Sequence, residues 1–437
     1  MKHWRQLWNT KMTNAKRRLW PFGRSVVPPY RPAPPVRAAT RGPRHHFFGA
    51  YDRCPWSPSG RYLLAMETAF GHRPPASDDI ADVGLVDLDY AGRYISLADT
   101  TAWNWQQGAS AQWLPDRDPD CFVYNLFSGS ALRSVAVNTR CHVEREYDHP
   151  VYALAPDGSV ALTLDFRRLT AWRPDGGYAA FGVGNFGAPD TDDDGIRVMD
   201  MASGRTRLLL SFRSLRDWAC DRPDRVTGAY VHRLAFSRDG ARLAFLYVSR
   251  YGQGPAHSQL LTMAADGTDL YCVTSGFVSH FAWGPDDTIT AWCGTPSGPQ
   301  MAHRWGWVRM LQRGLRGPNL SGRIRRRCRA RERRYRLFRD GVGFIRDAGA
   351  DVLLSEGHPT LTPDGRRLVT DTVPTSREPG ALLLYDMALR RAGRLGTFPA
   401  QGDIRCHLHP RLAPDGTQIC FDSCHEGTRQ IYLMDIG

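Results

Sequence analysis

Residues 412–421 read L-A-P-D-G-T-Q-I-C-F, and the chain repeats this pattern of an apolar pair, a turn and a β-rich run. Proline fixes φ, aspartate caps its own turn and glycine accepts a positive φ, so Pro-Asp-Gly makes a tight reversal between two strands. Copies or near variants of the turn lie at residues 54–60, 112–116, 152–158, 234–240, 281–287, 361–365 and 412–416. Seven hairpins of one kind predict seven sheets.

A second strand pair follows several of these hairpins, for example from residues 382–386 to Leu395. About four strands in each repeat form the blade of a propeller. The sequence therefore predicts an all-β fold, a seven-bladed β-propeller, with six or eight blades as alternatives. The last blade ends at residues 430–434 and is one strand short, so we expect residues 45–52 to pair there and close the ring.

The positive charge is concentrated in two segments of this 437-residue chain, whose formal net charge is +13. Residues 1–44 contain eleven Lys or Arg and no acidic residue, and residues 303–336 contain thirteen Arg against Glu332 alone. We interpret residues 1–44 as a basic N-terminal tail with a proline-rich linker. Residues 45–437 would then form the propeller, with an arginine-rich insertion at about 303–336, and the rest of this body is acidic.

Both basic segments favour anionic surfaces as partners. Residues 1–20 can be wound into a helix with Trp4 and Trp8 on one stripe, which is typical of peripheral contact with an anionic membrane. A frayed basic tail is the alternative. The arginine-rich insertion has no nucleic-acid fold signature around it, so we expect no nucleic acid partner. We interpret it as a solvated insertion that touches anionic lipid or polysaccharide.

The cysteine pattern and hydropathy indicate the compartment. Ten cysteines are scattered without a C-x-x-C pair, and the N-terminal residues do not read as a secretory leader. No apolar run is long enough to span a membrane. We therefore expect a cytoplasmic protein, with peripheral contact at the inner membrane face through residues 1–20.

Four histidines lie just upstream of a blade's turn. His407 and His409 are two residues apart, so in an extended segment their imidazoles point the same way. His280 and His358 occupy similar places in two earlier blades. Because the innermost strands of a propeller line its central channel, we expect these side chains to converge at one end of the axis. Neutral imidazole is a common metal ligand, and hydrogen-bonded channel histidines are the alternative.

The Pro-Asp-Gly repeats resemble the TolB-like propeller repeat, and residues 230–437 look like oligogalacturonate lyase and its uncharacterised bacterial relatives. The motifs are S-H-F-A-W at 279–283, G-H-P-T-L-T-P-D-G at 357–365 and C-H-L-H-P at 406–410. The resemblance implies a divalent metal site at His358, His407 and His409. Mn²⁺ is the ion it implies, with Zn²⁺ or Fe²⁺ as alternatives. It also implies that His280 is the general base.

One position departs from the family pattern. The family has a further glutamine ligand where this chain has Ile404, which cannot bind a metal. Gln401, Asp403 or Cys406 are the candidates to substitute for it. A cysteine thiolate would shift the preference toward zinc.

The resemblance implies β-elimination on an acidic oligosaccharide or polysaccharide. That reaction needs a base, a cation that stabilises the developing negative charge, and help for the leaving oxygen. Arg250 is the candidate cation, and a surface arginine is the alternative.

Aromatic and amide side chains in the N-terminal half suit sugar rings and hydroxyl groups. Candidate substrate-binding residues are His46, Tyr51, Asn104 and Gln107. For the neighbouring Trp103 and Trp105, packing between blades is the alternative. Two functions therefore stay open: a polysaccharide lyase-like enzyme, and a non-catalytic propeller that binds a polysaccharide or protein partner in cell-surface glycan assembly.

Overall fold

The predicted turns join the first and second strands of each blade. In the computed structural model, the turn glycines take a positive φ, as at Gly365 (67°) and Gly416 (73°). Where glycine is missing from the motif, Asp116 (53°) and Asp286 (54°) adopt the same left-handed conformation. Asp415 Oδ1 accepts a hydrogen bond from the Thr417 amide at 2.9 Å, so the turn is capped as the sequence predicts.

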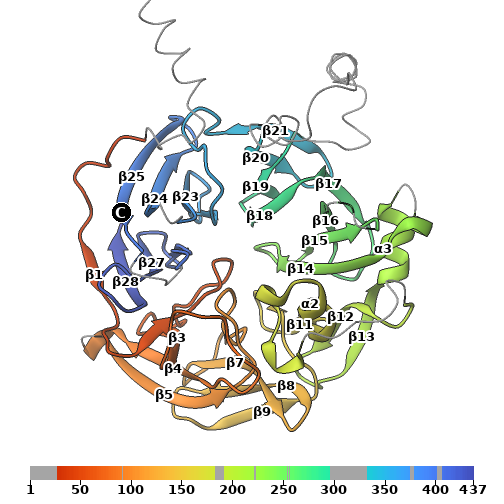
Figure 1. The fold of residues 1–437 in the computed structure, drawn as a ribbon, viewed down its shortest axis with the longest axis horizontal. Helices are drawn as coiled ribbons and strands as arrows, with labels where there is room; N and C mark the ends of the chain where they lie inside the picture. Colours follow the sequence, from red (N-terminus) through yellow and green to blue (C-terminus); the bar gives the residue numbers. More distant parts are fainter. Residues whose placement is uncertain are drawn as a thin grey trace, which may run out of the picture.

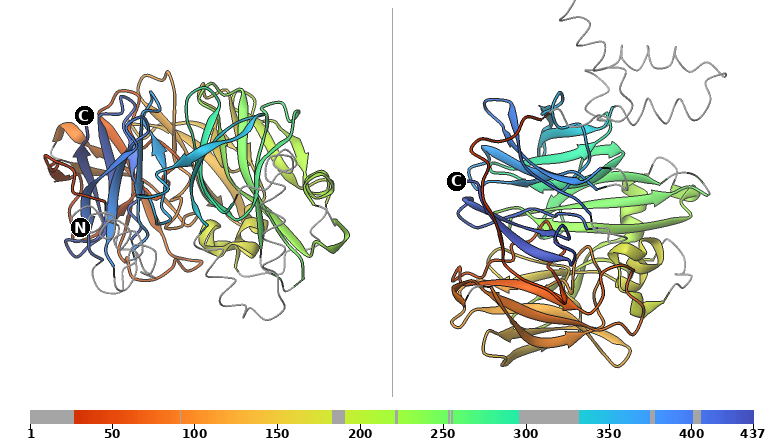
Figure 2. Two further views of the ribbon diagram at one scale, coloured as in Figure 1. Left: turned by 90° about the horizontal axis from the view of Figure 1, so that it is seen from above. Right: turned by 60° about the vertical axis from the view of Figure 1, so that its left-hand side comes forward.

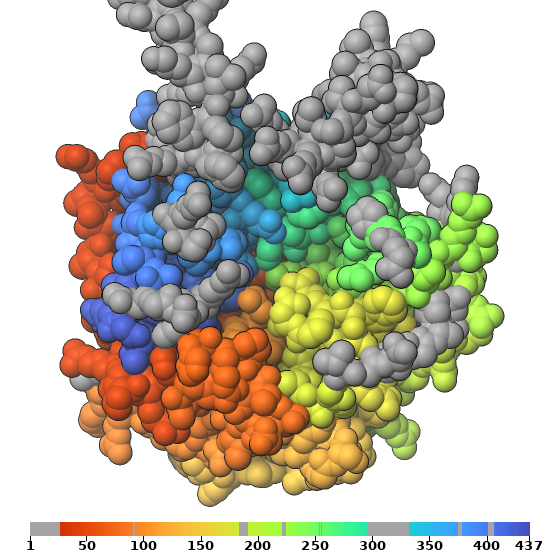
Figure 3. All heavy atoms as spheres, in the orientation of Figure 1, coloured from red at the N-terminus to blue at the C-terminus, as the bar shows by residue number. Residues whose placement is uncertain are grey.

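The structure describes residues 27–437 except 91, 183–190, 221–222, 253, 255, 296–331, 375–377 and 401–405. The strands form seven four-stranded antiparallel sheets that stand as blades around one axis (Figures 1 and 2). The prediction of an all-β, seven-bladed propeller is confirmed. The blades follow one another around the ring in sequence order and pack into one body (Figure 3).

From the axis outwards, the strands of the first three blades are β2 (His45–Phe47), β3 (Tyr62–Thr68), β4 (Ala81–Asp87), β5 (Arg93–Thr100); β6 (Gln112–Leu114), β7 (Cys121–Ser128), β8 (Ala131–Asn138), β9 (Val143–Tyr147); and β10 (Ala153–Leu154), β11 (Val160–Thr163), β12 (Gly195–Asp200), β13 (Thr206–Ser211). Blades 4 to 6 are β14 (Gly228–Phe236), β15 (Arg242–Arg250), β16 (His257–Ala264), β17 (Tyr271–Gly276); β18 (Val278–Trp283), β19 (Thr288–Cys293), β20 (Arg334–Arg339), β21 (Gly343–Ala348); and β22 (Thr360–Leu361), β23 (Arg367–Asp371), β24 (Gly380–Asp386), β25 (Arg391–Phe398). Blade 7 is β26 (Arg411–Leu412), β27 (Gln418–Ser423), β28 (Gln430–Asp435) and β1 (Val36–Ala38).

The ring is closed by β1, which pairs antiparallel with β28, so that Val36 faces Met434. The prediction that residues 45–52 close the ring is wrong, because β2 is instead the innermost strand of blade 1. Pro34 and Pro35, which precede β1, do not prevent this pairing, since an edge strand forms hydrogen bonds with a neighbouring strand on one side only. The propeller therefore starts within the segment 1–44 that the sequence analysis assigned to tail and linker.

Two sides of each sheet are buried because each blade packs between two others. On β3, Leu63 and Ala65 pack against blade 7, whereas Leu64 and Met66 pack against blade 2. The described residues form seven such apolar clusters, one at each interface between neighbouring blades. Alternation along a strand therefore divides its apolar side chains between two cores.

Two short helices lie in connections on the blade 3 side. Helix α2 (Phe166–Trp172) is capped by Asp165, and α3 (Phe212–Ala219) is capped by Ser211. Short 3-10 turns are η1 (Leu88–Tyr90), η2 (Pro174–Gly176), η3 (Ala179–Phe181) and η4 (Pro223–Arg225). No helix within the described ranges is long and apolar enough to cross a membrane.

The arginine-rich segment is shorter than the predicted insertion at 303–336. Strand β20 begins at Arg334, and Arg336 is buried with its Nε 3.1 Å from Asp347 Oδ1. Residues 334–336 therefore belong to blade 5. Most of the predicted insertion, residues 303–331, lies outside the described residues. The predicted helix over residues 1–20 lies outside them as well.

Candidate functional site

In the sequence repeat, one residue position lies close to the propeller axis. It lies six residues before the aspartate of the turn, within the innermost strand or just before it. In blades 4 to 7 this position holds Arg233, His280, His358 and His409, which precede Asp239, Asp286, Asp364 and Asp415. Because the blades are related by rotation about the axis, equal offsets bring these side chains together.

His358, His407 and His409 converge as expected. One ring nitrogen of each lies within 4.8 Å of the other two, so this group could hold a metal ion. Ring centroids are 4.1 Å apart for His358 and His409, and 5.2 Å apart for His358 and His407. His358 and His409 are buried, whereas His407 is half-buried.

Asp371, at the end of β23, holds two of these histidines. Its carboxylate accepts hydrogen bonds from the His358 amide at 2.7 Å, from His358 Nδ1 at 2.9 Å and from the His409 amide at 3.2 Å. Burial would raise the pKa of Asp371, but the neighbouring His358 outweighs this and lowers it. The carboxylate therefore fixes the proton of His358 on Nδ1 and leaves the Nε2 lone pair free to act as a ligand.

The electrostatics suit a metal. Burial, followed by the neighbouring His358, lowers the pKa of His409 well below its usual value and that of His407 to about 4. Both imidazoles are therefore neutral at neutral pH, as metal ligands must be. His407 Nδ1 and His409 Nε2 are buried and have no partner in the part of the chain that the structure describes. The cluster fits a divalent metal.

The suggested substitutes for the missing fourth ligand are not all placed. Ile404, Gln401 and Asp403 lie outside the described residues. Cys406 is buried, and a hydrogen bond with Cys424 and then burial raise the pKa of its thiol well above the usual value. Cys406 is not among the described residues whose ligand atoms converge with those of His358, His407 and His409.

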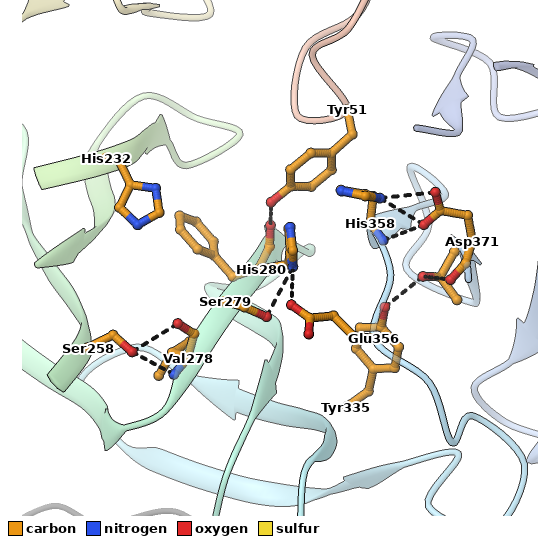
Figure 4. Close-up of polar contacts among 12 residues, drawn as sticks. Tyr51, His232, Ser258, Val278, Ser279, His280, Tyr335, Glu356, His358 and Asp371 are labelled. Carbon is orange, nitrogen blue, oxygen red and sulfur yellow. Dashed lines mark hydrogen bonds and ion pairs between the residues drawn. The ribbon is translucent and has the colours of Figure 1, made fainter. Parts of the chain in front are cut away.

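His280 lies next to the group on β18 (Figure 4). Its ring centroid is 4.5 Å from that of His358, and its Nδ1 lies 3.0 Å from Ser279 Oγ and 3.2 Å from Glu356 Oε1. Burial and then Arg233 lower the pKa of His280 well below the usual value. His280 is therefore a neutral base beside a carboxylate.

Tyr51 reaches the same place from the connection between β2 and β3 (Figure 4). Its hydroxyl donates to the Phe281 carbonyl at 3.1 Å. Its ring centroid lies 5.1 Å from that of His358 and 5.6 Å from that of His280. Of the four predicted substrate-binding residues, Tyr51 is the one in contact with the histidines.

The predicted cation Arg250 is not part of the cluster. It is exposed at the end of β15, and its guanidinium lies 5.7 Å from the Trp172 ring. The charge near His280 comes instead from Arg233, which is 7% exposed and lies 4.8 Å from the Tyr51 ring. Arg233 has a φ of 54°, a conformation that turns its side chain away from the regular course of β14.

The other predicted substrate-binding residues have structural contacts. His46 bridges Gln430 and Glu67 through its two ring nitrogens, each at 2.9 Å. Asn104 caps its own turn by accepting from the Gln106 and Gln107 amides at 2.9 Å. Both side chains therefore make hydrogen bonds within the folded structure.

Gln107 lies near the cluster without contacting the histidines. Its Nε2 donates to Tyr152 Oη at 3.0 Å, and it lines a small cavity of about 20 Å³ with Tyr51 and Arg233. Trp103 is fully buried and Trp105 packs on Phe47, so packing between blades accounts for both tryptophans.

Sequence reasoning missed Arg233, Asp371 and Glu356. The sequence does contain a pattern that points to Arg233, because this residue lies at the same distance before its turn as three of the histidines do. Asp371 ends an apolar strand like many turn-facing aspartates, and Glu356 lies in an irregular connection. Only the tertiary structure distinguishes these two from ordinary surface carboxylates.

No protein-family model matches the chain, and no curated protein matches its sequence. Solved structures are similar in fold. An oligogalacturonate lyase from Vibrio parahaemolyticus is 12% identical with a TM-score of 0.58, over 94% of this chain and 96% of that one. An oligogalacturonate lyase in complex with manganese is 15% identical with a TM-score of 0.60, over 92% of this chain and 93% of that one. The predicted resemblance is confirmed at the level of the fold.

Proposed function

We propose that this propeller is a lyase that carries out a metal-assisted β-elimination on an acidic oligosaccharide. The observation that carries the proposal is the axial cluster itself. Three imidazoles, of which His407 and His409 are neutral, have ring nitrogens within 4.8 Å of one another. A further neutral histidine, His280, lies against His358. A metal-binding group and a base at one place are what this reaction needs.

His358, His407 and His409 would hold the metal, Mn²⁺ in the first place, with Zn²⁺ or Fe²⁺ as alternatives. When bound, the metal supplies a positive charge that neutralises the substrate carboxylate and stabilises the negative charge that develops as the α-proton leaves. Asp371 would orient His358 through the hydrogen bond to Nδ1.

His280 would take the α-proton. The elimination breaks a C–H bond and a C–O bond and forms a C=C bond, so the α-proton must pass to a base and the departing sugar oxygen must take up a proton from solvent. Because Glu356 and Ser279 lie at Nδ1, the tautomer with its proton there leaves the Nε2 lone pair free. The imidazolium that forms would be stabilised by the Glu356 carboxylate. Arg233 would take the place of Arg250 as the second cation.

One observation favours the other candidate function, a non-catalytic propeller that binds a polysaccharide or protein partner. Tyr51 packs on His280 and His358, and all three residues are at most 9% exposed. Because the base and a metal-binding histidine are buried under this packing, a sugar would need a movement of these side chains to reach both. A binding protein whose histidines only support the axis would not require this movement.

Metal removal tests the proposal first. We expect the purified full-length protein to contain about one equivalent of Mn, Zn or Fe by elemental analysis, and the His358→Ala variant to lose it. Asp371→Asn should weaken the metal affinity by about 10–100-fold, because this carboxylate orients a ligand. A wild-type protein that takes up no stoichiometric metal, even when it is supplied, would remove the metal-assisted mechanism.

Activity on uronate oligomers tests the base. The product of β-elimination has a conjugated double bond, which is followed by its ultraviolet absorbance. His280→Ala should lower kcat by about 10²–10⁴-fold, while His142→Ala, an exposed histidine on blade 2, should behave like wild type. Absence of product from the wild type, with metal bound and uronate still binding, would favour the non-catalytic propeller.

A further inference from the structure

We propose that the protein binds a small monovalent inorganic anion, such as chloride, beside the Arg233 guanidinium near the propeller axis. This inference does not rest on the proposed function, because the anion would bind Arg233 whether or not an acidic sugar later displaces it. The site is a small cavity between blades 2, 3 and 4, where Gln107, Arg173 and Arg233 are among the lining residues. None of the four clustered histidines lines it.

Arg233 lies at a break in the regular ladder of blade 4. The pairing of β14 with β15 shifts register between His232 and Ala235, and Arg233 has a φ of 54°. Its backbone amide donates to Tyr152 Oη at 2.6 Å, which holds this irregular conformation in place. A bulge redirects the side chain that it carries. The Arg233 guanidinium accordingly reaches the Tyr51 ring, 4.8 Å away.

This guanidinium is a buried positive charge without a counter-ion. Arg233 is 7% exposed, and its side chain forms no hydrogen bond or ion pair within the described ranges. Its Nε is closed off from solvent, whereas the two Nη atoms, which also lack a partner, are still accessible to it. A buried charge without a partner is unfavourable because it has lost its hydration. An anion at the Nη atoms would remove this cost.

The size of the cavity limits what can bind there. Arg233, Arg173 and Tyr51 line a volume of about 20 Å³, which is close to the space that one water molecule needs. A phosphate, or a carboxylate with its carbon chain, is too large for this space, whereas a halide ion is similar in size to a water molecule. The volume therefore favours a monatomic anion.

The charges around the cavity favour a single negative charge. Arg173 supplies a second guanidinium, whose Nη1 lies 3.1 Å from Nδ1 of His232. Asp175 lies 3.4 Å from Arg173 Nη2, but its side chain is 61% exposed, so water screens this pair. Among the described lining residues, the Asp52 carboxylate is the acidic group that stands against the two guanidinium groups. One net positive charge is left, and one monovalent anion neutralises it.

Thermal unfolding of the full-length protein tests the site. Chloride replaces isethionate, an organic sulfonate that is too large for the cavity, at constant ionic strength. We expect chloride to raise the unfolding midpoint in a saturable way, because a ligand that binds only the folded chain stabilises it. Bromide should have the same effect, and its anomalous X-ray scattering in crystals should show one ion beside Arg233.

Variants separate this site from other places where chloride is attracted. Arg233→Gln should weaken the apparent chloride affinity by about tenfold or more, because it removes the charged donor. Arg250→Gln removes an exposed arginine from the same blade and should keep the wild-type response. Both variants keep the arginine-rich segments of the chain, so chloride near those segments contributes equally to all measurements. Wild-type protein freed of metal with a chelator should also keep the response.

The proposal is overturned if chloride and isethionate give the same midpoint, if Arg233→Gln responds like wild type, or if bromide crystals show only water beside Arg233. Loss of the response after metal removal would overturn it as well, because the anion would then lie on the metal. If Arg233→Gln does not fold, Arg173→Gln changes a side chain that is 27% exposed, and unchanged chloride affinity in this variant would contradict the site. Failure of the lyase assay has no bearing on these results.

Discussion

His232 shows how burial determines the charge of a side chain near the axis. It is 5% exposed, and its Nδ1 lies 3.1 Å from Arg173 Nη1. Burial and then the positive charges of Arg173 and Arg233 lower its pKa well below the usual value. His232 is therefore neutral in the folded protein and accepts a hydrogen bond from Arg173. It lies apart from His358 (Figure 4).

We predict that the protein loses stability on acidification and that His232 accounts for part of the loss. Below about pH 6.5 the unfolded chain protonates this histidine while the folded chain does not. The free energy of unfolding therefore decreases as the pH decreases, by at most about 1.4 kcal/mol per pH unit for one histidine. Urea unfolding of His232→Asn between about pH 7 and pH 5 should show a shallower slope than wild type.

The exposed His142 supplies the control for this measurement. His142→Asn should keep the wild-type slope, because it removes a histidine that is exposed on the surface of the folded chain. Equal slopes for wild type and His232→Asn would contradict the assignment of a lowered pKa to His232.

At the scale of elements, a polar side chain on the second strand ties one blade to the next. Asn125 on β7 accepts from the Val151 amide that leads into blade 3, at 2.8 Å. Asp371 on β23 accepts from the His409 amide before blade 7. Asp422 on β27 accepts from the Gly49 amide after β2 of blade 1. The histidines therefore occupy positions that are fixed by the connection between blades.

We predict that Asp422→Asn destabilises the protein, in part because its single amide oxygen cannot replace both carboxylate oxygens, one of which accepts from the Phe48 amide and the other from the Gly49 amide. Asp422 and Arg411 are each 1% exposed on their side chains and lie 2.8 Å apart, so the variant leaves a buried positive charge without its partner. Breaking such a pair costs about 3–5 kcal/mol. Urea unfolding followed by circular dichroism measures this loss.

The matched control is an exposed pair. Arg133 and Asp148 lie 3.3 Å apart with side chains 40% and 79% exposed, so Asp148→Asn should cost less than about 1 kcal/mol. Adding Arg411→Met to Asp422→Asn should recover part of the stability. A loss below about 1 kcal/mol in Asp422→Asn would show that the buried pair contributes little.

At the scale of the whole molecule, the ring depends on a strand from the other end of the chain. Beyond the β1–β28 ladder, the Ala39 amide donates to the Ile431 carbonyl at 2.8 Å, and the Ile431 amide donates to Thr40 Oγ1 at 2.9 Å. Ala39 and Ile431 are buried in the cluster between blades 7 and 1. Closure thus joins the two ends of the fold.

We predict that removal of residues 1–41 lowers the thermal unfolding midpoint by more than removal of residues 1–26 does. The longer truncation deletes β1 and several hydrogen bonds worth roughly 1 kcal/mol each. Differential scanning calorimetry of both truncated proteins beside the full chain measures the effect. Equal midpoints for the two truncations would show that β1 is dispensable for closure.

The local pattern predicts much of the site as well as the fold. Regular offsets from the turns were enough to expect His280, His358, His407 and His409 at one end of the axis. The same offset applied to Arg233 would have identified the buried cation. The prediction of Arg250 rests on an approximate match to the family. The register of β14 and β15 does not support it, because Arg250 pairs with Gly228 at the outer end of the hairpin.

By itself the sequence determined the blades, because turn chemistry and strand alternation are local properties that repeat seven times. It also determined the convergence of the histidines, since equal offsets in a rotationally repeated fold lead to one axis. Only the tertiary structure decided that β1 closes the ring, that Tyr51 packs on His280 and His358, and that Asp371 holds His358. These contacts join residues far apart in the chain, and their energies come from burial and charge that no local pattern contains.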